Sequence, residues 1–244
     1  MSRNYDEEFR DNTNRKYQYE IDIFVRERFL ERHRPFFSQK NRVEVLEIGS
    51  FDGSMTNLLL GYFKQLEVVE PSSILARFVS DRFRDRVYIH NSKVEDFKTE
   101  KKYDHIFLVH TLEHLDEPAD ALIKLRDLLT EQGKLYIMVP NAGALSRRIA
   151  MQMGLMSSTT DVLESERIHG HLRTYDISSL RRDILNAKLK ILDSGGILVK
   201  PLANYQIDAA LKTSIIDEKF LLACDGLADA LPDFCSSIYV VAAK

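Results

Sequence analysis

The alternation of short apolar runs with helical stretches constrains the fold of this 244-residue chain most strongly. Runs typical of strands occupy residues 43–48, 66–69, 87–91, 104–110, 135–139, 189–200 and 237–242. Stretches with helical spacing, which separate most of these runs, occupy 55–63, 73–83, 118–129, 178–187 and 205–227. Strands that alternate with helices favour parallel pairing, with helices packed on both faces of the sheet. We therefore expect an α/β domain built on a mostly parallel, seven-stranded sheet.

Two segments depart from this alternation. Residues 17–37 combine charged side chains with Ile21, Phe24 and Phe29 at an imperfect helical spacing, which predicts amphipathic helices. Residues 141–176 are rich in Met, Ser, Thr and Arg and follow the fifth expected strand, which a turn at 131–133 precedes. We expect an N-terminal helical lid over residues 1–40, a cap insertion over 141–176, and a single domain spanning 1–244.

Composition excludes several classes of function. The 34 basic and 37 acidic residues leave a formal charge of -3, which does not attract nucleic acid or an anionic membrane. No apolar run approaches the ~20 residues that span a bilayer, and the polar start lacks the core of a signal peptide. We expect a cytoplasmic protein in which Cys224 and Cys235 are reduced thiols, because they form no CxxC pattern.

The residues after the first expected strand carry the main chemical signal. Gly49 and Gly53 stand where that strand meets its helix, the usual nucleotide site of a doubly wound sheet. A dinucleotide fingerprint beginning at Gly49 fails, because Phe51 and Ser54 occupy the second and third glycine positions. The pattern from Glu47 to Gly53 instead reads E-x-G-x-x-x-G. It resembles motif I of the class I S-adenosylmethionine-dependent methyltransferases, with Phe51 in place of that family's middle glycine.

This resemblance extends through residues 43–140 and implies a Rossmann-like fold with an inserted cap after the fifth strand. Glu70 ends the second expected strand at an offset of 70 − 49 = 21 residues, near the ~20 at which a carboxylate meets ribose hydroxyls. Residues 91–97 resemble the adenine-binding stretch, and 112–115 resemble the Leu-Glu-His-Leu signature of small-molecule methyltransferases. The resemblance implies that the cofactor is S-adenosylmethionine and that its contacts are Glu47, Gly49, Phe51, Gly53, Glu70, Val94, Glu95 and His110.

Catalysis requires alignment of a nucleophile with the methyl group and, for a protonated acceptor, a base. His114 follows the fourth expected strand and titrates near neutrality, so it is the candidate base. The chain is similar here to phosphoethanolamine methyltransferases, which pair such a histidine with an N-terminal tyrosine. That similarity implies Tyr17 or Tyr19 as the catalytic partner.

The acceptor side is expected in the cap and the residues after it. Arginine, histidine, tyrosine and lysine side chains cluster there in a chain without net positive charge, which suggests a clamp for an anionic group. The candidates are Arg147, His171, Arg173, Tyr175 and Lys200. The string from His169 to Tyr175 resembles methyltransferases of sugar and surface-polysaccharide biosynthesis. This implies a small acceptor, either a phosphorylated amine or a sugar nucleotide, and a homodimer stays open.

Other interpretations stay open beside this one. The protein is alternatively a non-catalytic relative that binds S-adenosylmethionine, or a nicotinamide-dependent oxidoreductase, since fold alone does not fix function. A nucleic-acid methyltransferase ranks last, because the chain lacks a basic domain and a base-amine motif. We expect no metal: His169 and His171 lack the helical i, i+4 spacing, and the neighbouring arginines Arg167 and Arg173 disfavour a cation.

Overall fold

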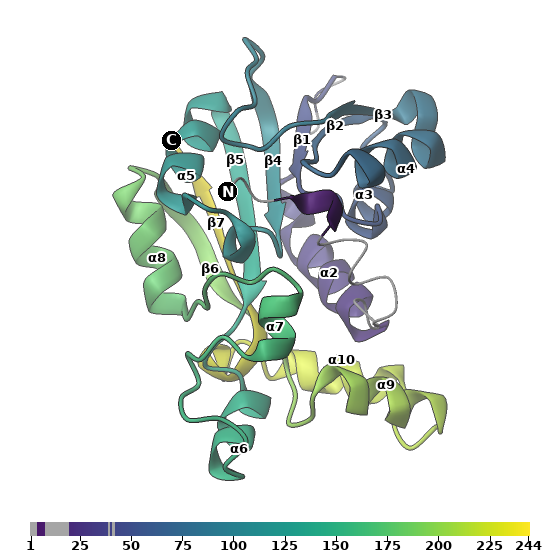
Figure 1. The fold of residues 1–244 in the computed structure, drawn as a ribbon, viewed down its shortest axis with the longest axis vertical. Coiled ribbons are helices and arrows are strands. Elements are labelled where there is room, and N and C mark those ends of the chain that lie inside the picture. The colour runs from purple at the N-terminus through teal and green to yellow at the C-terminus, as the bar shows by residue number, and fades with distance from the viewer. Residues whose placement is uncertain (1–3, 8–19, 39, 41) are drawn as a thin grey trace.

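The computed structural model describes residues 4–7, 20–38, 40 and 42–244. Its centre is one seven-stranded sheet in the order β3-β2-β1-β4-β5-β7-β6 (Figure 1). Strands β1 to β5 pair in parallel, and β7 pairs antiparallel with both β5 and β6. The strands are β1 (Val45–Ile48), β2 (Leu66–Val69), β3 (Val87–His90), β4 (Tyr103–Val109), β5 (Leu129–Pro140), β6 (Lys190–Val199) and β7 (Cys235–Ala243). The expected mostly parallel, seven-stranded sheet is confirmed.

Helices cover both faces of the sheet, as the sequence predicts. One face packs against α5 (Pro118–Leu128) and α8 (Ile177–Asn186), whose Leu122 and Leu180 are fully buried. The opposite face packs against α2 (Glu20–His33), α3 (Ser54–Leu59), α4 (Ser73–Phe83), α9 (Asn204–Lys212) and α10 (Glu218–Gly226). Neighbouring residues of β4 divide between the two cores, since Ile106 faces the first and Phe107 the second. The alternation follows from the two-residue period of a strand.

The cap insertion contains α6 (Leu145–Gln152) and α7 (Glu164–Ile168), between β5 and α8. Figure 1 shows α6, α7, α9 and α10 at the end of the sheet toward which the arrows of β4 and β5 point. Because β2 and β4 flank β1 on opposite sides, the chain reverses direction across the sheet there. Ligands bind in the crevice at such a switch point, outside the carboxyl ends of the strands.

Two local predictions are wrong. The turn expected at 131–133 lies within β5, which begins at Leu129 because that residue is fully buried and pairs with Tyr103. The irregularity appears instead as a register shift between Tyr103 and His105. The single helix expected over 205–227 is divided into α9 and α10, since Asp217 caps α10 by accepting a hydrogen bond from the backbone N–H of Phe220.

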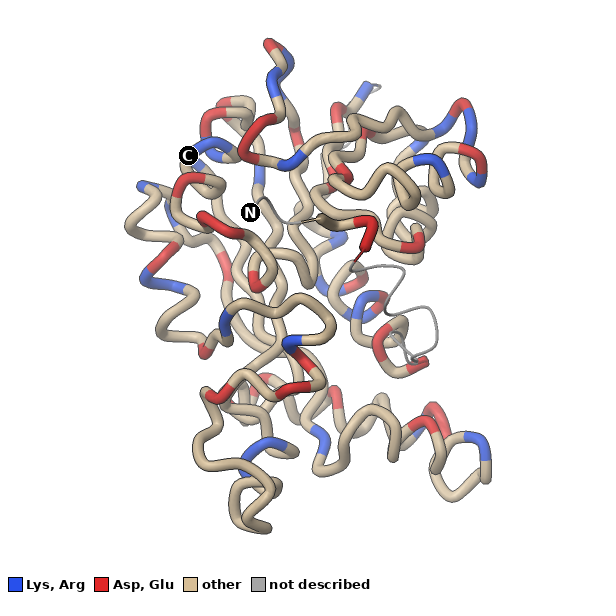
Figure 2. The backbone as a smooth tube through the Cα atoms, viewed as in Figure 1, with Lys and Arg blue, Asp and Glu red and all other residues tan. Residues whose placement is uncertain are grey.

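Acidic and basic residues are interspersed over the described backbone (Figure 2). Among the described helices, none combines the length and apolar character required to cross a bilayer. Cys224 and Cys235 are free thiols, the first half-buried and the second buried. Burial raises the pKa of the Cys235 thiol to about 12, which keeps it protonated.

Candidate active site

A cavity of about 530 Å³ lies at the carboxyl ends of the central strands. Segments far apart in sequence line it: the turn after β1, the end of β2, the residues after β3 and β4, helix α2, the cap, and the start of α9. The sequence-predicted site residues that line it are Gly49, Phe51, Glu70, Val94, Glu95, His110, His114, Arg147, His171 and Lys200. Glu47, Gly53, Arg173 and Tyr175 are not among the lining residues, and Tyr17 and Tyr19 lie outside the described residues.

The turn after β1 brings backbone to the edge of the cavity. Gly49 has a φ of +76°, and a Cβ atom there would lie 2.9 Å from the side chain of Thr111. Its N–H donates to the Val69 carbonyl over 2.9 Å, which joins the turn to β2. Phe51 also has a positive φ, +47°, a conformation that glycine adopts without strain. The Phe51 backbone thus keeps the left-handed shape expected of a glycine in this turn.

Glu70 is buried at the end of β2 and binds the same turn. Its Oε2 accepts hydrogen bonds from the backbone N–H groups of Ser50 (2.9 Å) and Phe51 (3.1 Å), and from the Ser50 hydroxyl. Its Oε1 accepts from the N–H of Ser72 over 3.0 Å. Burial raises the pKa of Glu70, and these hydrogen bonds oppose that rise. The carboxylate therefore organises the turn and faces the cavity at once.

Glu47 and Gly53 lie beneath this turn. The Glu47 carboxylate is 1% exposed and accepts a 2.7 Å hydrogen bond from the Thr56 hydroxyl of α3. Burial raises the pKa of Glu47 to about 8. Gly53 has a φ of +76° at the N-terminus of α3, where a Cβ atom would lie 2.7 Å from the Phe83 ring. Both residues therefore support the turn without lining the cavity.

Residues 4–7, part of the helical lid expected over residues 1–40, border the end of the cavity near Ser72 and Lys93 through contacts that the sequence did not predict. Tyr5 lines the cavity, and the Lys93 ammonium lies 5.3 Å from the centroid of its ring. Asp6 accepts 2.6 Å hydrogen bonds from the hydroxyls of both Ser72 and Ser73. These hydrogen bonds lower the pKa of Asp6. Asp6 and its serine partners are more than sixty residues apart in the chain. A single sequence carries no local signal for a contact over such a separation.

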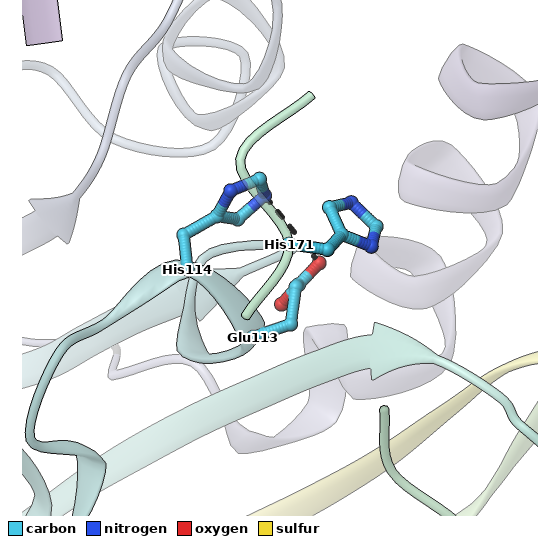
Figure 3. Close-up of side chains that lie close together, drawn as sticks. All are labelled: Glu113, His114 and His171. Carbon is cyan, nitrogen blue, oxygen red and sulfur yellow. Dashed lines mark ion pairs between the residues drawn. The ribbon is translucent and has the colours of Figure 1, made fainter. Parts of the chain in front are cut away.

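Three titratable side chains meet at the part of the cavity formed by η3 and the segment before α8. Glu113 and His114 lie on the 3-10 helix η3 (Leu112–His114) after β4, and His171 lies in the segment before α8 (Figure 3). The His114 Nε2 is 3.9 Å from the Glu113 Oε1, and the rings of His114 and His171 meet edge to face with centroids 4.7 Å apart. Burial lowers the pKa of His171 to about 4, so its imidazole is neutral at physiological pH. Burial also holds the pKa of His110 well below its usual range.

The basic candidates of the cap separate into different environments. Arg147 lines the cavity, forms an ion pair with Glu166, and donates from Nε to the Thr159 carbonyl over 2.9 Å. Arg173 donates to the carbonyl oxygens of Leu115 and Asp116, and so fastens the His171 segment to the loop after η3. Arg147 therefore lines the cavity, whereas Arg173 stabilises the adjoining loop and does not line the cavity.

Tyr175 and Lys200 differ in the same way. Tyr175 is buried in the core of the first face, and its carbonyl accepts from the N–H of Ala142 over 2.7 Å. Lys200 lines the cavity, is 4% exposed, and donates from Nζ to the Leu202 carbonyl over 2.8 Å. Burial lowers the pKa of Lys200 to about 8. Lys200 therefore places a titratable cation within the cavity.

Helix α2 contributes lining residues that the sequence analysis did not single out. Asp22, Val25 and Arg26 share one helical face and line the cavity, because residues three and four apart lie on one side of a helix. The positive charge of Arg26 lowers the pKa of Glu113, against the larger effect of burial. The sequence signal for this lining was the pair of polar residues at positions 22 and 26, each next to a buried apolar residue of α2, Ile21 or Val25.

Comparisons with known proteins agree with this geometry. A family model described as a methyltransferase domain matches residues 17–194. The fold is similar to an S-adenosylmethionine-dependent methyltransferase of Thermotoga maritima, described as a possible histamine N-methyltransferase, at 15% identity and a TM-score of 0.63, covering 98% of this chain and 99% of that one. It is also similar to N-methyltransferase NodS of Bradyrhizobium japonicum WM9 in complex with S-adenosylhomocysteine, at 14% identity and a TM-score of 0.61, covering 98% and 96%.

A third similar structure is the [4+2]-cyclase SpnF, at 16% identity and a TM-score of 0.61, covering 89% of this chain and 81% of that one. Among curated proteins, none matches the chain by sequence. Identities this low establish the shared fold, whereas the family match rests on the sequence model.

Proposed function

The chain belongs to the class I S-adenosylmethionine-dependent methyltransferases, and we propose that it methylates the nitrogen of a small polar amine, with a phosphorylated amine as the preferred acceptor. The observation that carries this proposal is the division of one cavity into two chemically different ends. One end presents backbone and a carboxylate, and the other presents the group of Glu113, His114 and His171.

The first end fits S-adenosylmethionine. The absence of a side chain at Gly49 leaves backbone open to the cavity, at a position where a Cβ atom would already meet Thr111. Glu70 supplies a buried carboxylate that suits ribose hydroxyls, and Val94 and Glu95 stand after β3, where the adenine is expected. The bound cofactor supplies a methyl group activated by a sulfonium. The Gly49–Phe51 backbone, Glu70, Val94, Glu95 and His110 would hold it.

The second end suits an acceptor that must lose a proton. His114 is our candidate for the base, because it lines the cavity beside a buried carboxylate and next to a neutral histidine. Residues of α2, α7 and the start of α9 all border the cavity, and these elements would help to exclude water from it. Alignment of the acceptor with the methyl group supplies much of the rate of a direct displacement.

An anionic group on the acceptor is supported by the basic residues of the wall. Lys200 and Arg26 line the cavity, on β6's end and on α2 respectively. An amine that also bears a phosphate would offer complementary charges to these cations and to Glu113. The similar NodS and Thermotoga maritima structures carry descriptions as N-methyltransferases, which favours nitrogen as the methylated atom.

A single assay tests the proposal. The purified protein is incubated with methyl-labelled S-adenosylmethionine and a panel of phosphoethanolamine, ethanolamine, histamine and a sugar nucleotide. Mass spectrometry then identifies the products that carry the label. We expect the label on the nitrogen of the phosphorylated amine. Label on the sugar nucleotide would identify the other acceptor class. Calorimetric binding of S-adenosylhomocysteine without any methylated product would instead support a non-catalytic relative, and the SpnF cyclase fold shows that such an architecture also hosts other chemistry.

A further inference from the structure

Glu113 is a buried titratable group of the site whose part in the reaction has not been described above. It lines the cavity, yet it is only 1% exposed. Among the described residues, neither of its carboxylate oxygens has a hydrogen-bond partner. Figure 3 shows the carboxylate directed toward His114 and His171. The side chain thus presents two oxygens without hydrogen-bond partners beside two histidines at the cavity wall.

Backbone contacts between η3 and the segment around His171 fix the position of Glu113. The N–H of Leu172 donates to the Glu113 carbonyl over 3.0 Å, and Arg173 holds the carbonyl oxygens of Leu115 and Asp116. These contacts tie η3 to the His171 segment from both sides. A buried carboxyl group without a hydrogen-bond partner is unfavourable, and one at the wall of a cavity is a candidate for binding a ligand. The ligand that satisfies both oxygens must donate hydrogen bonds and, for an ionised carboxylate, carry positive charge.

We propose that Glu113 binds the protonated amino group of the acceptor and receives the proton that this nitrogen must lose before methylation. The inference rests on the proposed function and narrows its substrate class to primary and secondary alkylamines. An ammonium group has up to three donors and a compact positive charge, which matches two buried acceptor oxygens. A hydroxyl has one donor and no charge, so it leaves one oxygen unsatisfied.

The proton and electron balance is simple. An N–H bond of the ammonium breaks, and its proton passes to a Glu113 oxygen while the lone pair stays on nitrogen. That lone pair forms the new N–C bond as the S–C bond of the methyl donor breaks, and the sulfonium becomes a neutral thioether. Glu113 then passes the proton to His114, whose Nε2 is 3.9 Å away, and from there to solvent. The methylated product leaves as an ammonium.

The charged and titratable groups that act on Glu113 come from several elements. Arg26 of α2 favours the ionised carboxylate, whereas Glu166 of α7 opposes it. His114 is its neighbour on η3, and His171 faces the same space. Burial outweighs them and raises the pKa of Glu113 to about 8, so that the free enzyme at pH 7 holds this group mainly protonated. Binding of an ammonium therefore expels a proton.

A divalent metal is the competing occupant, since one atom each from Glu113, His114 and His171 lies within 4.8 Å of the others. The observations favour the ammonium. A tetrahedral zinc ion, which lies about 2.0–2.2 Å from each ligand, would bring the ligand atoms to about 3.3–3.6 Å from one another, whereas the Glu113 Oε1 and the His114 Nε2 are 3.9 Å apart. Arg26 and Arg147 add positive charge beside the cluster, which disfavours a doubly charged ion more than a singly charged ammonium. Direct displacement at a sulfonium also requires no Lewis acid.

Proton release tests the proposal without relying on turnover. Wild-type protein saturated with S-adenosylhomocysteine is titrated with phosphoethanolamine in a calorimeter at pH 7, in two buffers of different ionisation enthalpy. The difference between the two binding enthalpies gives the number of protons released. We expect release of between half a proton and one proton per amine bound in the wild type. Binding without proton release overturns the proposal, as does binding that depends on added Zn²⁺ or is lost with a chelator.

Matched variants complete the experiment. Glu113→Gln keeps the volume and removes the charge, and we expect kcat/KM for the amine to fall at least 100-fold while the affinity for S-adenosylhomocysteine changes less than twofold. Glu113→Asp keeps the charge and should retain about a tenth of the activity; it replaces Glu113→Gln in the test if the latter does not fold. Glu117→Gln removes an exposed carboxylate four residues away and should match the wild type.

The outcomes separate this inference from the function on which it rests. Wild-type activity in Glu113→Gln, or methylation of ethylene glycol phosphate in preference to phosphoethanolamine, overturns the role of Glu113 and leaves methyl transfer intact. Failure of the wild type to bind S-adenosylhomocysteine, or to methylate any member of the panel, overturns the proposed function, and the inference falls with it.

Discussion

The two ends of the cavity, one proposed for the cofactor and one for the acceptor, are built in opposite ways. The cofactor end comes mainly from consecutive strand ends, because the turn after β1 and Glu70 after β2 lie within about twenty residues and bind each other directly. The acceptor end joins η3 to a segment nearly sixty residues later, with Arg173 as the brace between them. The first end is therefore a local device of the sheet, and the second depends on how the cap closes over it.

This difference predicts that changes at the acceptor end affect turnover while changes at the cofactor end affect binding. His114→Ala should show the largest effect, with kcat lower by roughly 10²–10⁴-fold, the usual range when acid–base catalysis is lost, because His114 takes the proton of the acceptor directly or from Glu113. The affinity for S-adenosylhomocysteine should stay within twofold, since His114 is placed beside the acceptor. Steady-state kinetics and calorimetry on one preparation make the comparison, and full activity across pH would remove His114 from catalysis.

At the cofactor end, Glu70→Ala should weaken S-adenosylhomocysteine binding by roughly 100-fold. The substitution removes the carboxylate that we propose binds the ribose, and it leaves the N–H groups of Ser50, Phe51 and Ser72 without their acceptor. Calorimetry measures the dissociation constant, with circular dichroism to verify the fold. Glu100→Ala, an exposed carboxylate, is the matched control and should bind normally. Equal affinity in both variants would contradict the assignment of Glu70.

Gly49→Ala tests the turn with a smaller change. The new Cβ would lie 2.9 Å from Thr111, in a backbone with a φ of +76°, so the turn must shift. We expect S-adenosylhomocysteine affinity to fall about tenfold, in line with a strain of ~1–3 kcal/mol. Gly226→Ala is the control, because a Cβ atom there has open space. A Gly49→Ala protein that binds as tightly as the wild type would show that the turn accommodates side chains freely.

The smallest predicted effect concerns stability and pH. The folded-state pKa of Glu113 is raised to about 8 by burial, whereas its ordinary value is 4.5, so the native state binds more protons than the unfolded state between these two pH values. This group therefore costs stability progressively as pH rises from 4.5 to 8. Glu113→Gln should match the wild type in Tm near pH 4.5 and exceed it by a margin that grows as pH rises to 8.

Thermal melts of the two proteins across this pH range check the sign. Glu117→Gln serves as the reference, since an exposed carboxylate should leave the pH dependence of Tm unchanged. A Tm difference between Glu113→Gln and the wild type that shrinks as pH rises would show that Glu113 is ionised and satisfied in the folded protein.

The same contrast explains which features were predictable. The five parallel strands and the turn at Gly49 follow from contiguous residues, because strand periodicity and a glycine-containing strand-helix turn are local signals. The start of β5 was missed because its pairing with Tyr103 outweighs the turn residues at 131–133. The break between α9 and α10 was missed because apolar spacing continues across it.

By itself, the sequence determined the fold class, the family and the methyl donor, since each depends on short motifs whose order along the chain places them at adjacent strand ends. Only the tertiary structure decided the acceptor end. Arg173 and Tyr175 have the residue types of a substrate clamp, yet packing directs the first to backbone carbonyls and the second into the core. Glu113 could equally have faced solvent; the closure of the His171 segment over η3 is what buries its carboxylate beside two histidines, because burial is set by distant neighbours rather than by local sequence.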